Sequence, residues 1–361
     1  MYFNGIIQVF ITSETTGIRK QLLTVISIKT RNDSTQIGSY CDIAVPLNSR
    51  IQYSDGNDLT ALSKTLFVTG DRIQVYGRYT TYEDSEIDQN QNIDQYPSLL
   101  LFDGFILDYF EGNPLLIKCV DYFYNLNMVP PISLTLNDSL KNCVDLILKG
   151  TGITQMPGTF DFEIVNMPIL NMTPAAILDH LKKELGINIS LIGNSLFVNI
   201  ASKTLNTVKL DTSVNVIESN ISRKTTTFQK YRVKAWFLKE DHTKDSFETG
   251  DEGGQIKEVF FYKVTNTNPI IIDTLEGKKK IPQAYYDLAK SALAKFKMNS
   301  YNGTVKTKLY PMIEIFDLVI YNDVRYPDRN GTYTCTGRDG EFDPKGFNWT
   351  YKLAYLKENA S

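Results

Sequence analysis

Histidine is scarce in this sequence. The chain of 361 residues contains two histidines, His180 and His242. Histidine is the usual acid–base group near neutral pH and the commonest metal ligand, so most metal and acid–base sites cannot be built here. His180 falls beside the apolar face of a helical stretch and His242 lies among charged residues. We interpret the first as a helix residue and the second as a loop residue.

Several motifs of common enzymes are also missing. The sequence has no nucleophile elbow, no P-loop, no dinucleotide-binding glycine pattern, no metalloprotease helix motif and no Cys-x-x-Cys. Its four cysteines, Cys41, Cys119, Cys143 and Cys335, are far apart and lie in apolar surroundings. This spacing predicts buried thiols and not disulfides or a metal cage. We therefore expect no enzymatic activity, no cofactor and no bound metal.

The chain has neither a basic excess nor a long apolar run. Its formal net charge is -3, which gives no overall positive field to attract DNA or an anionic membrane. No stretch is apolar over the length needed to span a bilayer, and the first residues do not follow the pattern of a secretory signal. We expect no sequence-specific nucleic-acid binding, no membrane insertion, and folding in the cytoplasm where the chain is made.

Strand-forming residues are abundant instead. The chain has 21 Tyr and 19 Phe together with many β-branched residues, a composition that suits a pleated, half-buried surface. The first third contains apolar runs separated by turn signals, of which Gly70-Asp71 and Glu111–Pro114 are the clearest. These runs predict strands over residues 5–11, 22–29, 37–45, 66–68, 72–79, 99–109 and 115–120. Short strands at this spacing are typical of a tube-like antiparallel barrel.

The middle of the chain changes to a helical period. Apolar residues recur at helical spacing between Asn137 and Gly150, and Gly150 is placed to end that helix. A second helix is predicted from Thr173, as N-cap, to Gly186. A β-hairpin over residues 189–200 follows it. These elements predict a small α+β module.

The last third returns to strands. Residues 231–238 and 347–355 alternate apolar and polar side chains, which predicts one buried face for each strand. A helix that starts after Pro282 would plug or flank a second barrel, and Asp328–Gly331 predicts a tight hairpin. We therefore expect a mainly β fold in which two tube-like antiparallel β-barrels flank the α+β module, with domains at 1–128, 129–210 and 211–361.

Carboxylates are the remaining candidates for catalysis. A glycosidase needs two of them, held about 5 to 9 Å apart. Asp339, Glu341 and Asp343 form one cluster, and Asp251 with Glu252 forms another. Because such clusters are more often solvated turns than catalytic pairs, a glycan- or cell-wall-degrading enzyme remains the alternative function.

Three further features have both a functional and an ordinary interpretation. The acidic segment 82–96 is predicted to be a long exposed loop. Its oxygens could bind calcium, although it lacks the glycine of an EF-hand loop: Asp84, Glu86, Asp88, Asn90, Asn92 and Asp94. Lys278–Lys280 is predicted to be a solvated turn. Trp236 or Trp349 could form the platform of a glycan-binding module if exposed, but their alternating strands favour a core or interface position.

Three stretches, taken in order, resemble the tail-hub family, which includes the late-control proteins of contractile phages and the hub part of type VI secretion spike proteins. The first comprises Thr69–Val75, Phe102–Ile106 and Leu116–Tyr122. In that family a Gly-Asp turn leads into a strand, and an apolar-x-Gly strand pairs with one that ends in Cys-x-Asp. The second stretch is the helix and Gly-Asn hairpin of residues 173–200.

The third stretch runs from the helix at Ala284 through Gly303-Thr304-Val305 and Pro311-Met312-Ile313 to Gly331-Thr332-Tyr333. It is similar to the family's Gly-x-Val, Pro-x-Ile and Gly-x-Tyr strands. Phe316-Asp317 stands where the family has Gly-Asp, so the geometry of that turn is in question.

The resemblance implies two barrels per chain and a homotrimer whose six barrels form a pseudo-sixfold ring. Such a ring would connect a hexameric tail tube protein to a separate, trimeric central spike protein. It would contact other baseplate components and let DNA, tape-measure protein or effectors pass. Four acidic residues are candidates for the channel lining: Glu83, Asp84, Glu86 and Asp88. The particle would be a virion tail baseplate or a contractile injection system.

Overall fold

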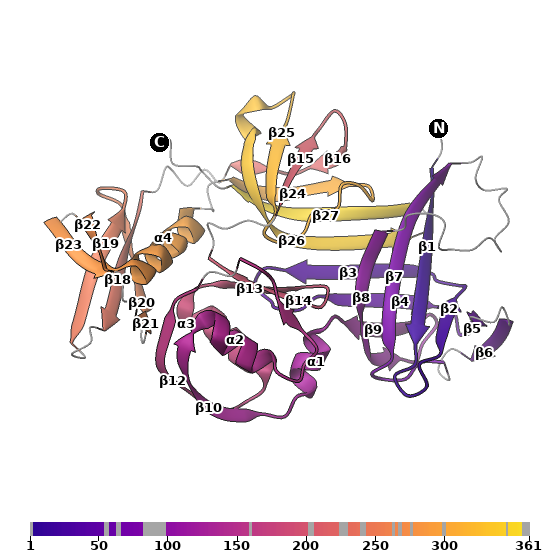
Figure 1. The fold of residues 1–361 in the computed structure, drawn as a ribbon. Helices are drawn as coiled ribbons and strands as arrows, with labels where there is room; N and C mark the ends of the chain where they lie inside the picture. Colours follow the sequence, from indigo (N-terminus) through magenta and orange to yellow (C-terminus); the bar gives the residue numbers. More distant parts are fainter. Residues whose placement is uncertain are drawn as a thin grey trace.

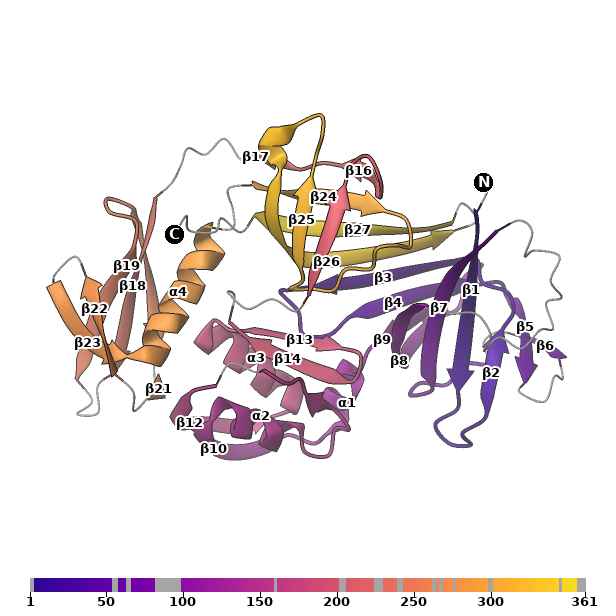
Figure 2. The ribbon, with the colours of Figure 1, turned by 45° about the horizontal axis from the view of Figure 1, so that its top comes forward.

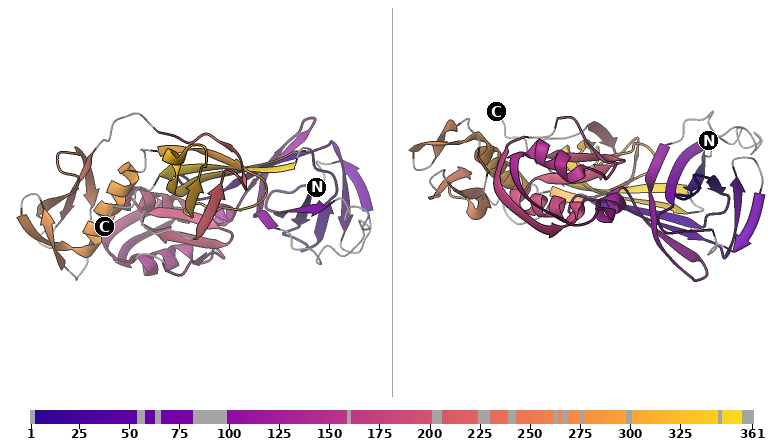
Figure 3. Two further views of the ribbon diagram at one scale, coloured as in Figure 1. Left: turned by 90° about the horizontal axis from the view of Figure 1, so that it is seen from above. Right: turned by 60° about the horizontal axis from the view of Figure 1, so that its bottom comes forward.

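The computed structural model describes residues 3–53, 58–62, 66–81, 99–158, 161–200, 206–223, 230–238, 243–261, 264–265, 269–274, 277–297, 301–343 and 346–355. The fold is mainly β with a small α+β part, as the sequence predicts. A sheet of 16 strands forms the main body. Figure 1 shows this body together with the helical module and a further small lobe, and the views in Figure 3 place that lobe and the N-terminal strands at opposite ends of the molecule.

The first third is built from nine strands in the described ranges. They are β1 (Phe3–Thr12), β2 (Arg19–Leu22), β3 (Ser27–Asp33), β4 (Tyr40–Val45), β5 (Asn48–Tyr53), β6 (Asp58–Leu62), β7 (Arg72–Thr81), β8 (Leu99–Phe110) and β9 (Leu115–Val120). The predicted strand over 22–29 is interrupted: Leu22 ends β2, residues 23–26 belong to no strand, and residues 27–29 begin β3. Residues 66–68 form no strand, although Leu66 and Phe67 are buried. The hairpin at Glu111–Pro114 is confirmed, since it joins the antiparallel pair β8 and β9.

The α+β module follows. It contains α1 (Phe123–Met128), β10 (Ile132–Ser139), α2 (Leu140–Leu148), β11 (Thr154–Gln155), β12 (Glu163–Met172), α3 (Pro174–Leu185), β13 (Asn188–Ile192) and β14 (Ser195–Asn199). The second predicted helix is confirmed: the Thr173 side chain accepts a hydrogen bond from Ala176 N, and Gly186 ends α3 with a φ of 63°. The first predicted helix starts later than expected, because the residues before Leu140 belong to β10.

The last third contains two groups of strands. Its elements are β15 (Thr207–Asp211), β16 (Val216–Ser219), β17 (Ser222–Arg223), β18 (Tyr231–Leu238), β19 (Lys244–Gly250), β20 (Gln255–Phe261), β21 (Val264–Thr265), β22 (Pro269–Thr274), β23 (Gly277–Pro282), α4 (Gln283–Lys297), β24 (Tyr301–Thr307), β25 (Leu318–Asn322), β26 (Gly331–Asp343) and β27 (Gly346–Tyr355). Helix α4 covers the small sheet β19-β18-β20 (Figure 2). Tyr285 of this helix stacks on Phe237 of β18, with ring centres 4.8 Å apart. It therefore flanks this separate lobe and not the strands β24 to β27.

The connection between β25 and β26 differs from the predicted tight hairpin. A short 3-10 helix, Pro327–Arg329, lies in it, and Asn330 has a φ of -64°. A two-residue hairpin turn of the favoured type needs positive φ at both central residues, so the prediction of such a turn is wrong. Asn330 instead accepts a hydrogen bond from Asp323 N through its side-chain oxygen.

The main sheet links both ends of the sequence. Its strand order is β16-β24-β27-β26-β3-β4-β9-β8-β7-β1-β2-β5-β6, with β15, β17 and β25 attached at its sides. Strand pairs that would close either half into a barrel are not found among the described residues. One hydrophobic core extends through both halves and includes the fully buried Ile43, Ile117 and Trp349.

Candidate functional site

The turn before β7 is held by the end of β8. Gly70 N donates to Ile106 O at 2.9 Å, and Ile106 N donates to Asp71 O at 2.9 Å. The Asp71 carboxylate accepts a hydrogen bond from Glu14 N at 3.1 Å. Gly70 has a φ of 94°, a conformation that glycine adopts without steric cost. The turn thus fixes the point at which β7 starts to pair with β8.

The turn before β25 has the same hydrogen bonds. Phe316 N donates to Cys335 O at 2.8 Å, and Cys335 N donates to Asp317 O at 3.0 Å. The Asp317 carboxylate accepts from Asn206 N at 3.0 Å. Phe316 has a φ of 71°, which is costly for a bulky residue, but its ring is buried and stacks on Phe197 at 5.3 Å. The turn therefore keeps the Gly-Asp geometry without glycine.

The two turns lead into ladders of the same register. Arg72 lies opposite Phe105 in the pair β7 and β8. Leu318 lies opposite Thr334 in the pair β25 and β26. In each case the first paired residue directly follows the aspartate of the turn.

The next ladder in each half carries a register shift at the same place. Between β8 and β9 it falls between Ile106 and Asp108, and between β26 and β27 it falls between Cys335 and Gly337. Bulges of this kind bend a strand and are specific features of a fold. A shared bulge beside a shared turn indicates that the two halves have the same local architecture.

Two more strand pairs correspond between the halves. The pair of β9 and β4 corresponds to the pair of β27 and β24. The pair of β4 and β3 corresponds to the pairing of β24 with β16 and β17. The register fixes which positions correspond: 72 with 318, 106 with 335, 119 with 353, 41 with 303, and 31 with 222. We call β3, β4, β7, β8 and β9 the N-terminal repeat, and β16, β17, β24, β25, β26 and β27 the C-terminal repeat. The repeats differ outside these ladders, because β1 pairs antiparallel with β7 whereas β15 pairs parallel with β25.

The two repeats join edge to edge. Strand β26 pairs with β25 as far as Thr334 and then, on the same edge, pairs antiparallel with β3 from Gly337 to Phe342. Strands β27, β26 and β3 lie side by side in Figure 1, with β26 in the middle. This junction makes the two halves one sheet.

Ion pairs line the junction. Lys29 Nζ lies 3.0 Å from Glu341 Oε1, and Lys352 Nζ lies 3.0 Å from Asp33 and 3.7 Å from Asp339. The hydrogen bond to Asp33 raises the pKa of Lys352. Two of the three carboxylates proposed as a catalytic cluster therefore each have a lysine partner in a strand ladder. The side chain of the third, Asp343, lies outside the described residues.

The other acidic candidates form a turn. Asp251 lies between β19 and β20, where its carboxylate accepts a hydrogen bond from Tyr231 N at 3.2 Å. Glu252 beside it is exposed. Lys278–Lys280 lies in β23, so the prediction of a turn is wrong there, and Lys279 forms an ion pair with Asp245.

Both tryptophans lie in strands, as predicted. Trp349 is fully buried, and its Nε1 donates to Leu309 O at 3.2 Å, which confirms the core interpretation for this residue. Trp236 is half-buried, is stacked on Phe260, and has Lys234 Nζ 4.7 Å from its ring centre. Trp349 is therefore not an exposed platform.

The remaining predicted residues are distributed as follows. His180 is half-buried in α3, whereas His242 and the whole acidic segment 82–96 lie outside the described residues. All four cysteines are free and buried, as predicted. Among the residues that the structure describes, no group of three or more potential ligands is placed to hold a metal ion, and no helix is long and apolar enough to cross a membrane.

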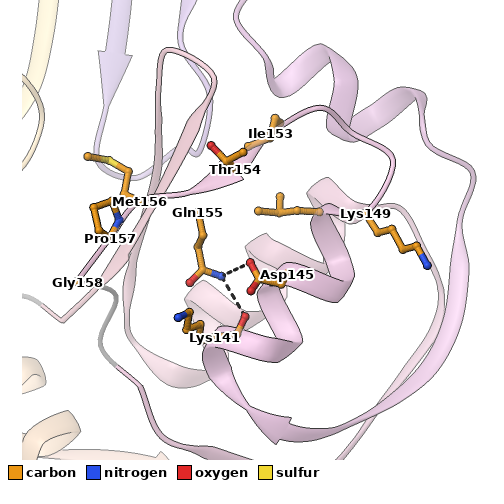
Figure 4. A pocket seen from close by; sticks show the side chains of 10 residues that line it. Lys141, Asp145, Lys149, Ile153, Thr154, Gln155, Met156, Pro157 and Gly158 are labelled. Carbon is orange, nitrogen blue, oxygen red and sulfur yellow. Dashed lines mark hydrogen bonds between the residues drawn. The ribbon is translucent and has the colours of Figure 1, made fainter.

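One open hollow lies in the α+β module, between α2 and β11 (Figure 4). Gln155 Nε2 donates to Lys141 O at 3.1 Å and to Asp145 Oδ1 at 3.3 Å across it. Asp145 is the one carboxylate among its described lining residues. The hollow thus offers no pair of acids of the kind a glycosidase uses.

A second hollow lies where the two repeats meet the module. Its lining includes Asp121, Arg338 and Glu314. Asp121 accepts hydrogen bonds from Ser39 N and Oγ, both at 2.7 Å, and from Phe123 N at 2.9 Å, and burial raises its pKa to about 6. Arg338 is buried, pairs with Glu314, and lies over a core ring. The Asp121 contacts thus tie β4, β9 and α1 together, and the Arg338–Glu314 pair ties β26 to the loop before β25.

A scan of protein-family models found no match, and a sequence comparison with curated proteins found none either. Solved structures, however, match along almost the whole chain. The tail protein from Neisseria meningitidis MC58 matches with a TM-score of 0.62 at 12% identity, covering 96% of both chains. The 43 kDa tail protein of prophage MuSo2 from Shewanella oneidensis matches with a TM-score of 0.59 at 14% identity, covering 97% of this chain and 98% of that one.

The chain shares the fold of phage tail proteins. A third match, with a TM-score of 0.54 at 8% identity over 97% of this chain and 77% of the other, is an E. coli component of the type VI secretion system with structural similarity to tail proteins of bacteriophage T4. This tail-protein fold confirms, at the level of fold, the resemblance carried by the three ordered stretches. Sequence reasoning did not find the edge-to-edge junction of the repeats.

Proposed function

We propose that this chain is a structural hub protein of a phage tail baseplate or a related contractile injection machine. The observation that carries the proposal is the internal duplication: one chain contains two repeats with the same turn, the same bulge and the same strand register. Two similar units in one chain allow three chains to imitate a ring of six. The tail-protein fold supports the same role.

In this proposal three copies form a pseudo-sixfold ring. One face matches a hexameric tail tube, the other faces a separate trimeric spike, and cargo passes through the centre. Residues 1–128 and 211–361 supply the two tube-like units, and 129–210 supplies the module between them. The role requires no catalysis, because binding is performed by strand edges and surface shape. Assembly takes place in the bacterial cytoplasm, and the finished ring belongs to the virion tail or injection particle.

The test is the size and shape of the purified protein. Light scattering is expected to give three times the chain mass over a wide concentration range, and electron microscopy of the same sample is expected to show a ring with six lobes. A protein that stays monomeric or dimeric, alone and after mixing with its tail tube and spike proteins, contradicts the proposal. Large permanent interfaces bury about 2,000 Å² or more, so a true trimer will persist on dilution.

A further inference from the structure

Strand β8 of the N-terminal repeat corresponds to β26 of the C-terminal repeat. The edge of β26 beyond its bulge is paired with another strand, whereas the same edge of β8 is unpaired among the described strands. In the C-terminal repeat, β26 continues past its bulge and pairs with β3. In the N-terminal repeat, β7 pairs with β8 only as far as Phe105. The part of β8 beyond the bulge, Asp108–Phe110, pairs with β9 on one side and has no strand on the other within the described chain.

A second open edge is complementary to the first. In the N-terminal repeat, β3 lies between β4 and β26. Among the described strands, β16 and β17 at the corresponding position of the C-terminal repeat pair with β24 on one side only, and β16 ends the main sheet. The described part of the chain therefore has one unoccupied edge like that of β26 and one unoccupied edge like that of β3.

Large apolar side chains are exposed on the open part of β8. Leu107 is 44% exposed and Phe110 is 47% exposed there. An open strand edge with apolar side chains attracts another strand, and proteins normally protect such edges. The two open edges therefore suit a partner that itself ends in a strand.

We propose that β8 of one copy pairs antiparallel with β17 of a second copy, in the register that β26 and β3 adopt within one chain. This inference rests on the proposed function and specifies its interface. Asp339 lies opposite Arg31 in the internal junction, and the corresponding positions are 110 and 222. Phe110 of one copy thus lies opposite Ser222 of the next, and Tyr109 lies opposite Arg223.

The chemistry of the new junction differs from that of the internal one. Lys352 binds Asp33 and Asp339 in the internal junction. At the corresponding position of the N-terminal repeat, Lys118 Nζ lies 4.6 Å from the ring centre of Phe110. The junction between copies is therefore more apolar than the internal one. Because salt screens exposed ion pairs and not apolar contacts, high salt will leave the assembly intact.

Each copy has one edge of each kind, so association is head to tail. Such contacts build a closed ring when the rotation between neighbours divides a full turn, and an open filament when it does not. Since the junction between copies has the register of the internal junction, successive repeats are related by similar rotations. This makes the second copy of the chain the partner that fits both edges.

The experiment is a disulfide cross-link at the predicted pair. Facing residues of antiparallel strands have Cα atoms about 4.5 to 5.5 Å apart, within the range that a disulfide spans. The double variant Phe110→Cys/Ser222→Cys is oxidised with oxidised glutathione and run on a denaturing gel without reductant. We expect covalent dimers and trimers. The native thiols do not interfere, because they are buried and burial raises the pKa of Cys335 to about 12 and that of Cys143 to about 11.

Two matched controls define the register. Asp339→Cys/Arg31→Cys places the same pair in the internal junction and is expected to give a link within one chain. Phe110→Cys/Glu218→Cys moves one partner four residues along the edge and is expected to give none. If the double variant does not fold, a mixture of the Phe110→Cys chain and the Ser222→Cys chain tests the same contact as a covalent heterodimer.

The outcomes separate this inference from the proposed function. A trimer by light scattering without a cross-link at this pair overturns the strand pairing and leaves the hub role intact. Cross-linked chains that grow into open filaments support the pairing and contradict the ring. Chains that stay monomeric and unlinked at all concentrations overturn both.

Discussion

Gly340 of β26 lies directly opposite Thr30 of β3, where the two repeats join. A Cβ atom at Gly340 would lie 2.4 Å from Thr30 Oγ1 and 2.5 Å from the ring of Trp349. Trp349 is fully buried and cannot move aside. The junction between the repeats therefore has no space for a side chain at this position.

The first prediction concerns this contact. We expect Gly340→Ala to lower the free energy of unfolding by about 1 to 3 kcal/mol, because the added Cβ atom overpacks the junction between the repeats. Urea denaturation measures the change. The matched control is Gly337→Ala in the same strand, where the added carbon meets the flexible Lys352 side chain. An equal or larger loss in the control would contradict the explanation.

The second prediction concerns the glycine-like turn at Phe316. Replacing Phe316 by Ala or by Gly removes the buried ring, and both variants will lose about 3 kcal/mol or more. Alanine keeps the cost of a positive φ, about 1 kcal/mol, whereas glycine does not. We therefore expect Phe316→Gly to be more stable than Phe316→Ala, the reverse of the order at positions with negative φ. Urea denaturation of both variants checks this, and the usual order would exclude strain at this turn.

The third prediction concerns pH. Burial raises the pKa of Asp121 to about 6 from an ordinary value of 3.8, so folding favours the protonated form. The stability that proton binding contributes is full below about pH 4 and is lost as the pH rises through 6. Relative to the non-titrating Asp121→Asn, the free energy of unfolding of the wild type should fall by up to about 3 kcal/mol between pH 4 and 7.

The measurement is urea denaturation of both proteins at several pH values. Parallel stability curves over this range would show that Asp121 does not titrate as described. A difference that grows with pH in favour of the wild type would contradict the sign.

The fourth prediction compares two ion pairs near the junction. Glu314→Gln leaves the buried Arg338 guanidinium without its charged partner, which we expect to cost about 3 kcal/mol or more. Glu341→Gln removes an exposed partner of Lys29 and should cost less than about 1 kcal/mol. Thermal and urea unfolding give both values. Similar losses in the two variants would show that burial does not set the difference.

Local signals in the sequence were read correctly where they are strong. The helix from Thr173 to Gly186 was predicted at both ends, because an N-cap threonine and a C-terminal glycine act within one turn. The alternation of apolar and polar residues in the final strand, Gly346–Tyr355, predicted its buried face, because this alternation is also a local signal.

Long-range pairing could not be read in this way. Strand β3 pairs with β26 across about three hundred residues, and no local pattern selects one edge strand over another. Leu66 and Phe67 were mistaken for a strand because apolar residues in a buried loop have the same composition as a short strand. The position of α4 was uncertain for a similar reason: its apolar face was predicted, but the sheet that it covers was not.

The strands next to the two repeats run in opposite senses relative to their neighbours, since β1 is antiparallel to β7 and β15 is parallel to β25. In the proposed assembly the matched ladders would repeat six times around the axis, whereas β1 and β15 would each repeat three times. A partner protein with sixfold symmetry and a partner protein with threefold symmetry would then each bind a matching surface on the same particle. No adaptor would be needed between them.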